Sequence, residues 1–322
     1  MRIYFWGTRG SIPISITTDL VRTKIKNALR AASGIAFPDG AAIDAFIRGL
    51  PFAEQGSYGS NTSCLEIEDS STAAVMICDA GSGLRDLGNH LLAKKKADKD
   101  VRPLEVHIFV SHLHWDHLSG FPFFVPANIA GNRIHIYGFH KELEQSFVRQ
   151  QNSTNFPLTL SEMRADISFH VLDVNQHIEV NGFIVRGIRQ HHPGTSYGYS
   201  FMKDGKKIVY STDAEHYQDA DEREYSFVDF FRHADLLVFD AQYTFADSIT
   251  AKEHWGHSSN MMAVELAIRS QVKRLCLFHN EPTKDDYALD QFLRDAKNYA
   301  SLCPGEHDLQ VHMSYDGLAI DI

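Results

Sequence analysis

A strand that ends in a cluster of metal-binding side chains constrains this chain more than any other feature. Val106 to Val110 is an apolar run typical of a buried strand, and four side chains that can bind metals follow within seven residues. They are His112, His114, Asp116 and His117. So many imidazoles beside a carboxylate are costly to bury without a cation, and nitrogen and carboxylate ligands suit zinc, with manganese or iron as alternatives. The cluster predicts a metal site at the end of a sheet.

Three more residues that can bind metals also follow predicted strands. His192 comes after the strand at 183–189, Asp213 after the apolar run 208–210, and His279 after 275–278. Taken alone, His192 or His279 is more often an ordinary hydrogen-bonded histidine. Their repeated position just past a buried strand predicts that they converge with residues 112–117.

Short β-branched and aromatic runs dominate the chain and predict many strands. They cover 2–6, 63–68, 73–78, 105–111, 133–137, 168–172, 176–180, 183–189, 197–202, 206–211, 236–239, 274–278 and 309–322. Asn181-Gly182 and Asp204-Gly205 predict tight turns of antiparallel hairpins. Helices are predicted from a Ser258 cap to about 270, and over about 286–300. With no linker in sight, we expect a single domain over residues 1–322.

One segment, about residues 15–55, interrupts the strand pattern. Apolar residues at helical spacing mark two amphipathic helices, which Gly34 and Pro38 separate. We therefore expect a helical hairpin inserted after the first strand. The pattern leaves open whether it is a lid over a pocket or a packing and dimer surface.

The successive motifs of the chain resemble those of the metallo-β-lactamase superfamily. The resemblance rests on residues 112–117, the aspartate of Cys78-Asp79-Ala80-Gly81-Ser82-Gly83, His192, Asp213 and His279, in that order. Further motifs at 7–13, 58–63, 240–244 and 255–259 are similar to the phosphodiesterase branch, which holds tRNA 3′-end-processing endonucleases and cyclic-phosphate or cyclic-nucleotide phosphodiesterases. The resemblance implies an α/β fold, the αββα sandwich of this superfamily, carrying the inserted hairpin.

The resemblance also implies a set of two metal sites. One ion would be held by His112, His114 and His192, the other by Asp116, His117 and His279, and Asp213 would bridge both. We prefer His192 over its neighbour His191, because in similar proteins the ligand directly precedes Pro-Gly. Asp79 is expected to orient a ligand and not to bind metal itself.

The expected reaction is hydrolysis by a hydroxide bridging the two metals. His257 is our candidate for the proton donor to the departing oxygen, with Asp240 orienting it. Similar tRNA-processing enzymes use an acidic residue and a later histidine in this way, although their acidic residue is usually glutamate and Asp240 is shorter.

The charge of the chain favours a small substrate. Thirty-one basic and 41 acidic residues give a net charge of −10, which argues against a broad surface for long nucleic acids. We therefore expect a small or cyclic phosphodiester, with a cyclic nucleotide as one option. The alternatives are tRNA or RNA 3′ processing, hydrolysis of a carboxylic ester or thioester, and a protein that binds without catalysis. No apolar stretch approaches the ~20 residues of a spanning helix, so we expect no membrane contact and a cytoplasmic location. A homodimer is one option, with the inserted hairpin as its surface.

Overall fold

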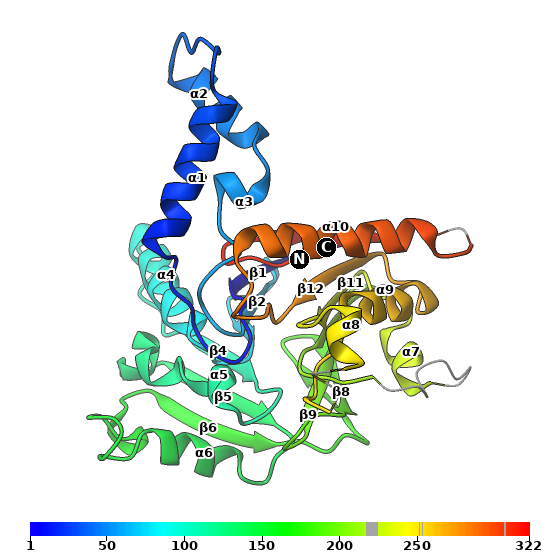
Figure 1. Ribbon diagram of the computed structural model, residues 1–322. Helices are drawn as coiled ribbons and strands as arrows, with labels where there is room; N and C mark the ends of the chain where they lie inside the picture. The colour runs from blue at the N-terminus through cyan, green and yellow to red at the C-terminus, as the bar shows by residue number, and fades with distance from the viewer. Residues whose placement is uncertain (217–224, 251, 253, 306) are drawn as a thin grey trace.

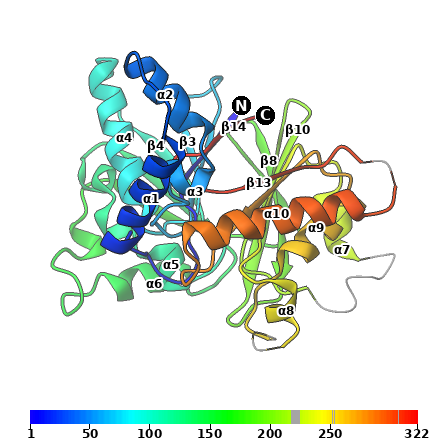
Figure 2. The same ribbon diagram turned by 45° about the horizontal axis from the view of Figure 1, so that its top comes forward.

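Two seven-stranded sheets pack face to face in the computed structural model, with helices on their outer faces (Figures 1 and 2). The structure describes residues 1–216, 225–250, 252, 254–305 and 307–322. The first sheet has the order β14-β1-β2-β3-β4-β5-β6 and the second β13-β12-β11-β10-β9-β8-β7. The predicted αββα sandwich is confirmed.

The strands match the predicted runs closely, because buried β-branched and aromatic residues mark them. In the first sheet they are β1 (Arg2–Gly7), β2 (Cys64–Glu68), β3 (Val75–Cys78), β4 (Glu105–Phe109), β5 (Arg133–Gly138), β6 (Asp166–Val171) and β14 (Ala319–Asp321). In the second they are β7 (His177–Val180), β8 (Phe183–Gln190), β9 (Ser196–Lys203), β10 (Lys206–Ser211), β11 (Leu236–Asp240), β12 (Arg274–Phe278) and β13 (Gln310–Met313).

Both predicted hairpins are present. In the turns, Asn181 and Gly182, and Asp204 and Gly205, all have positive φ, as two-residue turns of this kind require. The predicted run 309–322 is not one strand: β13 pairs with β12 in the second sheet, and β14 crosses to pair with β1 in the first. The two ends of the chain therefore lie side by side (Figure 1).

Three apolar layers hold the sandwich together. One core lies between the sheets, a second lies between the first sheet and the helices α4 (Gly83–Ala97) and α6 (Leu143–Gln150), and a third lies under α7 (Ser226–Phe231), α9 (Asn260–Arg269) and α10 (Asp286–Leu302). Figure 2 shows α4 and α9 on opposite outer sides of the two sheets. Short helices α5 (Trp115–Leu118) and α8 (Phe245–Ser248) lie in loops.

The helix predictions need one correction. Ser259, not Ser258, caps α9, since its hydroxyl accepts the backbone N–H of Met262 at 3.2 Å. The Ser258 hydroxyl instead donates to the carbonyl of Ala214 at 2.6 Å. Two adjacent serines make the capping residue ambiguous in sequence, and the contact with Ala214 decides it.

The insertion after β1 is helical as predicted. It contains α1 (Thr18–Ala31), α2 (Gly40–Gly49) and the short α3 (Phe52–Gln55), and α1 and α2 project from the body of the molecule (Figure 1). No residue of α1 or α2 is buried, and Ile25 and Leu29 are 55% and 67% exposed. The Lys24 ammonium ties α1 to the body through Asp286 at 2.6 Å. Within the described part of the chain, no helix has the length and apolarity needed to cross a bilayer.

Candidate metal centre

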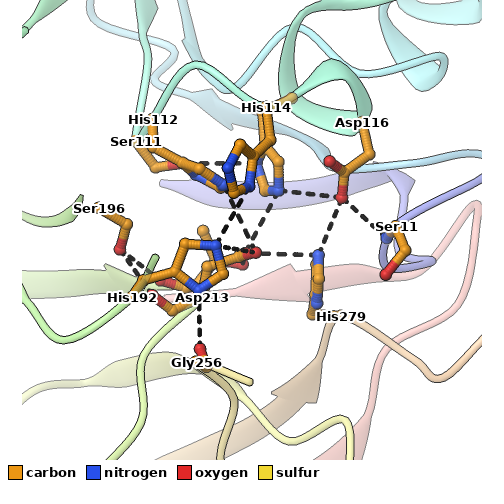
Figure 3. A network of polar contacts seen from close by, with 12 residues as sticks. Ser11, Ser111, His112, His114, Asp116, His192, Ser196, Asp213, Gly256 and His279 are labelled. Atoms are coloured by element: carbon orange, nitrogen blue, oxygen red, sulfur yellow. Dashed lines mark hydrogen bonds and ion pairs between the residues drawn. The ribbon is translucent and has the colours of Figure 1, made fainter. Parts of the chain in front are cut away.

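Three histidines converge from two loops at one edge of the sandwich (Figure 3). His112 and His114 come from the loop after β4, and His192 comes from the loop between β8 and β9. The facing atoms are Nε2 of His112, Nδ1 of His114 and Nε2 of His192, and the last two lie 3.2 Å apart. The predicted first ligand set is therefore brought together, and His114 takes part through Nδ1.

A second group lies beside the first and contains Asp116, His117, Asp213 and His279, all buried. The Nε2 atom of His117 lies 3.2 Å from Asp116 Oδ2 and 3.3 Å from Asp213 Oδ1. The Nε2 atom of His279 lies 3.2 Å and 3.4 Å from the same two oxygens. In a tetrahedral zinc site with bonds of about 2.0–2.2 Å, ligand atoms lie about 3.3–3.6 Å apart. The spacing of this group thus fits one ion.

Asp213 lies between the two groups. Its Oδ1 faces His117 and His279, whereas its Oδ2 lies 3.6 Å from Nε2 of His112 and 3.8 Å from Nε2 of His192. A carboxylate with one oxygen toward each group has the orientation that a bridging ligand needs.

Two of the facing ring nitrogens are placed to bind a metal. Nε2 of His112 and of His117 are buried and have no hydrogen-bond partner among the described residues. Their Nδ1 atoms are occupied: that of His112 lies 3.1 Å from the Ser111 hydroxyl and that of His117 lies 2.7 Å from Asp79 Oδ2. A fixed Nδ1–H leaves the Nε2 lone pair for a cation, which is the usual arrangement around protein-bound metals.

Asp79 holds the second group in place. Its carboxylate is fully buried and accepts hydrogen bonds from the Ser111 backbone N–H at 2.7 Å, the Ser111 hydroxyl at 2.8 Å and the Tyr210 hydroxyl at 2.7 Å, besides the bond from His117. The structure therefore places Asp79 behind a ligand and outside both groups.

Three of these residues follow strands in an unusual backbone conformation. Asp79 follows β3, Asp213 lies beyond β10 and His279 follows β12, and their φ angles are +60°, +48° and +63°. Residues other than glycine rarely adopt positive φ, and when they do they cluster at functional sites. The turn lets each side chain leave the strand direction and point into the site.

The loop after β1 supports the second group from the other side. The backbone N–H of Ser11 donates to Asp116 Oδ2 at 2.8 Å. A Cβ added to Gly10 would lie 2.6 Å from ring atoms of His279, so only glycine fits there. This contact explains part of the motif at 7–13.

His257 and Asp240 adjoin both groups. Nδ1 of His257 lies 2.9 Å from Asp240 Oδ2, and the ring stacks on His279 at 4.9 Å and meets His192 at 5.1 Å. Burial opposes a charge on this ring, but the carboxylates, Asp240 first among them, raise the pKa of His257 to about 9. The shorter aspartate thus reaches the histidine directly.

The charges of the two groups balance each other. Burial alone would raise the pKa of Asp213, but the imidazoles of His279 and His117 hold it well below its ordinary value. Burial, together with the neighbouring imidazole of His117, lowers the pKa of His112 well below the usual histidine value. The site therefore offers ionised carboxylates and, at His112, a neutral imidazole, the forms that bind cations. Burial opposes a charge on His117, but the carboxylates, Asp116 first among them, raise its pKa well above the ordinary value, so this ring would release a proton on binding a metal.

Two neighbours of the site could not be assigned from the sequence: the choice between His191 and His192 was only a preference, and Glu215 was missed. His191 belongs to neither group, and its carbonyl accepts the backbone N–H of Glu215. Glu215, which sequence reasoning missed, accepts the backbone N–H groups of His254 and Gly256 at 2.8 and 3.0 Å. The Gly256 carbonyl in turn lies 2.9 Å from His192 Nδ1 (Figure 3). The only signal for Glu215 in the sequence was its position two residues after Asp213.

Comparison with known proteins assigns the family. Residues 75–280 match the model of the β-lactamase superfamily domain, which includes residues 112–117, His192, Asp213 and His279. The chain belongs to the metallo-β-lactamase superfamily. The family and the two groups of ligands together identify it as a metal-dependent hydrolase.

Known members of the metallo-β-lactamase superfamily resemble the chain over most of their length. This chain is 25% identical over 281 residues to a Ribonuclease Z of Prochlorococcus marinus. The match covers 70% of this chain and 84% of that protein. The metallo-β-lactamase fold protein YhfI of Bacillus subtilis has a TM-score of 0.66 at 16% identity, covering 99% and 98% of the two chains. A diphosphatase of the PhnP family has a TM-score of 0.58 at 15% identity, covering 100% and 97%. These two structures show the shared fold.

Proposed function

We propose that this chain is a phosphodiesterase that uses two divalent metal ions to cleave a small or cyclic phosphodiester. The proposed ions are zinc, with manganese or iron as alternatives. His112, His114 and His192 would hold one ion, Asp116, His117 and His279 the other, and Asp213 would bridge them. The ligand spacing of 3.2–3.4 Å in the second group and the unpartnered Nε2 atoms support this assignment.

The ions, when bound, would activate water at neutral pH and stabilise negative charge on the phosphate oxygens. The chain itself would supply the proton. Because Nδ1 of His257 is engaged with Asp240, Nε2 is the atom left to carry a proton to the departing oxygen. Asp240 is fully buried and also accepts the backbone N–H of Ala214 at 3.0 Å, so it fixes the ring and favours its charged form.

The contact between His257 and Asp240 is the observation that carries this proposal. An alkoxide leaving from phosphorus needs a proton, and a buried imidazole paired with a carboxylate beside the metal ligands suits that need. Hydrolysis of a carboxylic ester or thioester with the same metals gives this pair no role. The name Ribonuclease Z of the relative from Prochlorococcus marinus also supports phosphodiester chemistry.

The test is a substrate panel on the metal-loaded full chain. Bis(p-nitrophenyl) phosphate, cyclic nucleotides and a thioester would be assayed with the wild type, His257→Ala and Asp240→Asn. We expect a loss on the order of 100-fold or more in both variants on cyclic nucleotides, whose departing alkoxide needs a proton. We expect a smaller loss on bis(p-nitrophenyl) phosphate, whose nitrophenolate leaves without one, and little change on the thioester. His254→Ala is the matched control, since His254 lies in the same loop and the variant keeps its backbone N–H, which donates to Glu215.

Failure of the wild type on every phosphodiester would refute the proposal. Cleavage of the thioester alone would favour the ester hydrolase, and cleavage of nothing by metal-loaded protein would favour a binding protein.

RNA 3′ processing is the second candidate, and the Ribonuclease Z relative favours it. The net charge of −10 opposes it, since phosphate contacts dominate nucleic-acid affinity. Incubation with a tRNA precursor would distinguish the two: endonucleolytic release of the 3′ trailer faster than turnover of any small phosphodiester would select this candidate.

Three further expectations stay predictions. A single folding unit over residues 1–322 would unfold in one cooperative transition with denaturant. A homodimer, for which the exposed apolar residues of α1 and α2 offer a surface, would appear as twice the chain mass in light scattering. A cytoplasmic location would be tested by cell fractionation.

A further inference from the structure

A third group of side chains that can bind a metal lies at the opposite end of β4 from the candidate metal centre. Glu105 and His107 are two residues apart on β4 and therefore point to the same face of the sheet. β5 runs parallel to β4, and its His135 is the register partner of His107. None of the three residues belongs to the centre described above, whose ligands follow the other end of β4.

The ligand atoms of this group lie near one another. Oε1 of Glu105 lies 3.7 Å from Nε2 of His107 and 4.0 Å from Nε2 of His135, and one ligand atom of each residue lies within 4.8 Å of the others. These spacings exceed the ~3.3–3.6 Å between the ligand atoms of a bound zinc ion, so the partly exposed Glu105 and His135 side chains would rotate to bind one. The other carboxylate oxygen of Glu105 is occupied by the Arg133 guanidinium at 2.7 Å. Each oxygen of Glu105 thus has a separate environment, and Oε1 faces the two imidazoles.

The Nε2 atom of His107 is the strongest sign of a binding site. His107 is only 5% exposed, and this nitrogen has no hydrogen-bond partner among the described residues. Buried polar atoms are usually satisfied, so an orphan of this kind calls for an explanation. His112 and His117 in the candidate metal centre share this feature, as do the buried His216 and the partly buried His312 elsewhere in the described chain.

The Nδ1 atoms of both imidazole rings contact hydroxyl groups. Nδ1 of His107 lies 3.1 Å from the Tyr137 hydroxyl, and Nδ1 of His135 lies 2.8 Å from the Ser168 hydroxyl. In the tautomer in which Nδ1–H donates to these hydroxyls, the Nε2 lone pair is free to bind a cation. Burial, and next the neighbouring His135, lower the pKa of His107 to about 4, so this ring is neutral at physiological pH.

We propose that Glu105, His107 and His135 bind a further zinc ion, independent of the candidate metal centre. Two imidazoles and one carboxylate are a ligand set that zinc favours, and three protein ligands leave a fourth position for water. The Glu105 and His135 side chains are 38% and 26% exposed, so an ion can enter from solvent. The bound ion would join β4 to β5 on the sheet face that these three side chains share, and would act on stability and not on the reaction.

The test is a zinc count on the purified full chain. Wild type, His107→Gln, His135→Ala and His170→Ala would be dialysed against the same zinc buffer and analysed by mass spectrometry of the metal. His170 is the matched control because it lies in the same ring stack, 5.6 Å from His135, and its Nε2 contacts the Ser168 hydroxyl. We expect one zinc fewer per chain in the first two variants and the wild-type count in His170→Ala.

A second measurement keeps the test independent of folding and of the proposed function. Added zinc beyond the amount that fills the candidate centre should raise the Tm of the wild type and of His170→Ala, but not that of His135→Ala, whose half-buried side chain can be removed at little risk to the fold. Equal zinc counts in all four proteins, or an equal loss in the His170→Ala control, would overturn the proposal. Failure of the candidate centre would lower every count together and leave the difference between variants intact.

Discussion

The carboxylate of Asp79 should control the zinc affinity of the second ligand group, although it contacts no metal. Asp79 accepts four hydrogen bonds at 2.7–2.8 Å, one of them from Nδ1 of His117. In Asp79→Asn one carboxylate oxygen becomes an NH₂ group. If it replaces Oδ2, it faces Nδ1–H of His117; if it replaces Oδ1, it faces the backbone N–H of Ser111. Either orientation sets two donors against each other.

The size of the effect follows from these contacts. Losing one buried hydrogen bond to a charged acceptor costs about 1.5–3 kcal/mol of the free energy of unfolding. Residues behind a metal ligand typically change metal affinity by about 10–100-fold, which corresponds to about 1.4–2.8 kcal/mol of binding free energy. We therefore expect Asp79→Asn to be both less stable and weaker in zinc binding.

The assays are denaturant unfolding of the metal-free protein and zinc titration in competition with a chelator. Asp229→Asn is the matched control, because Asp229 is 72% exposed in a surface ion pair with Arg232. Tyr210→Phe removes one of the four bonds and leaves that of His117, so its zinc affinity should stay within a few-fold of wild type. Wild-type zinc affinity in Asp79→Asn would refute the reasoning that Asp79 orients His117.

Four other predictions are independent of this one. Zinc affinity should be lost in His192→Ala but kept in His191→Ala, since only His192 faces the other ligands; a titration of both variants would check this, and the reverse outcome would exchange the assignment. Gly10→Ala places a Cβ 2.6 Å from the His279 ring and should lower activity by on the order of 100-fold, measured as kcat at saturating zinc. Removing metal with a chelator should abolish turnover and lower the Tm, and zinc should restore both. Burial lowers the pKa of His216 to about 3. Because the unfolded chain binds that proton near 6.5 and the folded chain only near 3, stability should fall as pH drops through this window; His216→Phe should flatten this pH dependence in urea melts, and an unchanged slope would contradict it.

The strands and the local ligand cluster could be predicted because their signals lie within a few residues. Buried strands require continuous apolar or β-branched runs, and residues 112–117 are joined by a single loop. The helix α4 escaped prediction, since it begins at Gly83 after Ser82 without a hydrogen bond from a capping side chain. The strand-like run 309–322 forms two strands, β13 and β14, which lie at the edges of different sheets. The sequence does not show this division, because edge strands of either sheet have similar residues.

The sequence by itself determined that strand ends would supply the ligands, because each strand must be apolar up to the point where the chain turns. Only the tertiary structure decided how those ends meet. Asp213, at positive φ, faces both groups, and His114 turns its Nδ1 toward His192 of the second sheet. The pairing of His107 with His135 depends on the register between two strands separated by 23 residues of chain from Val110 to Asn132. Such contacts are set by packing over long sequence separations, where no local pattern records them.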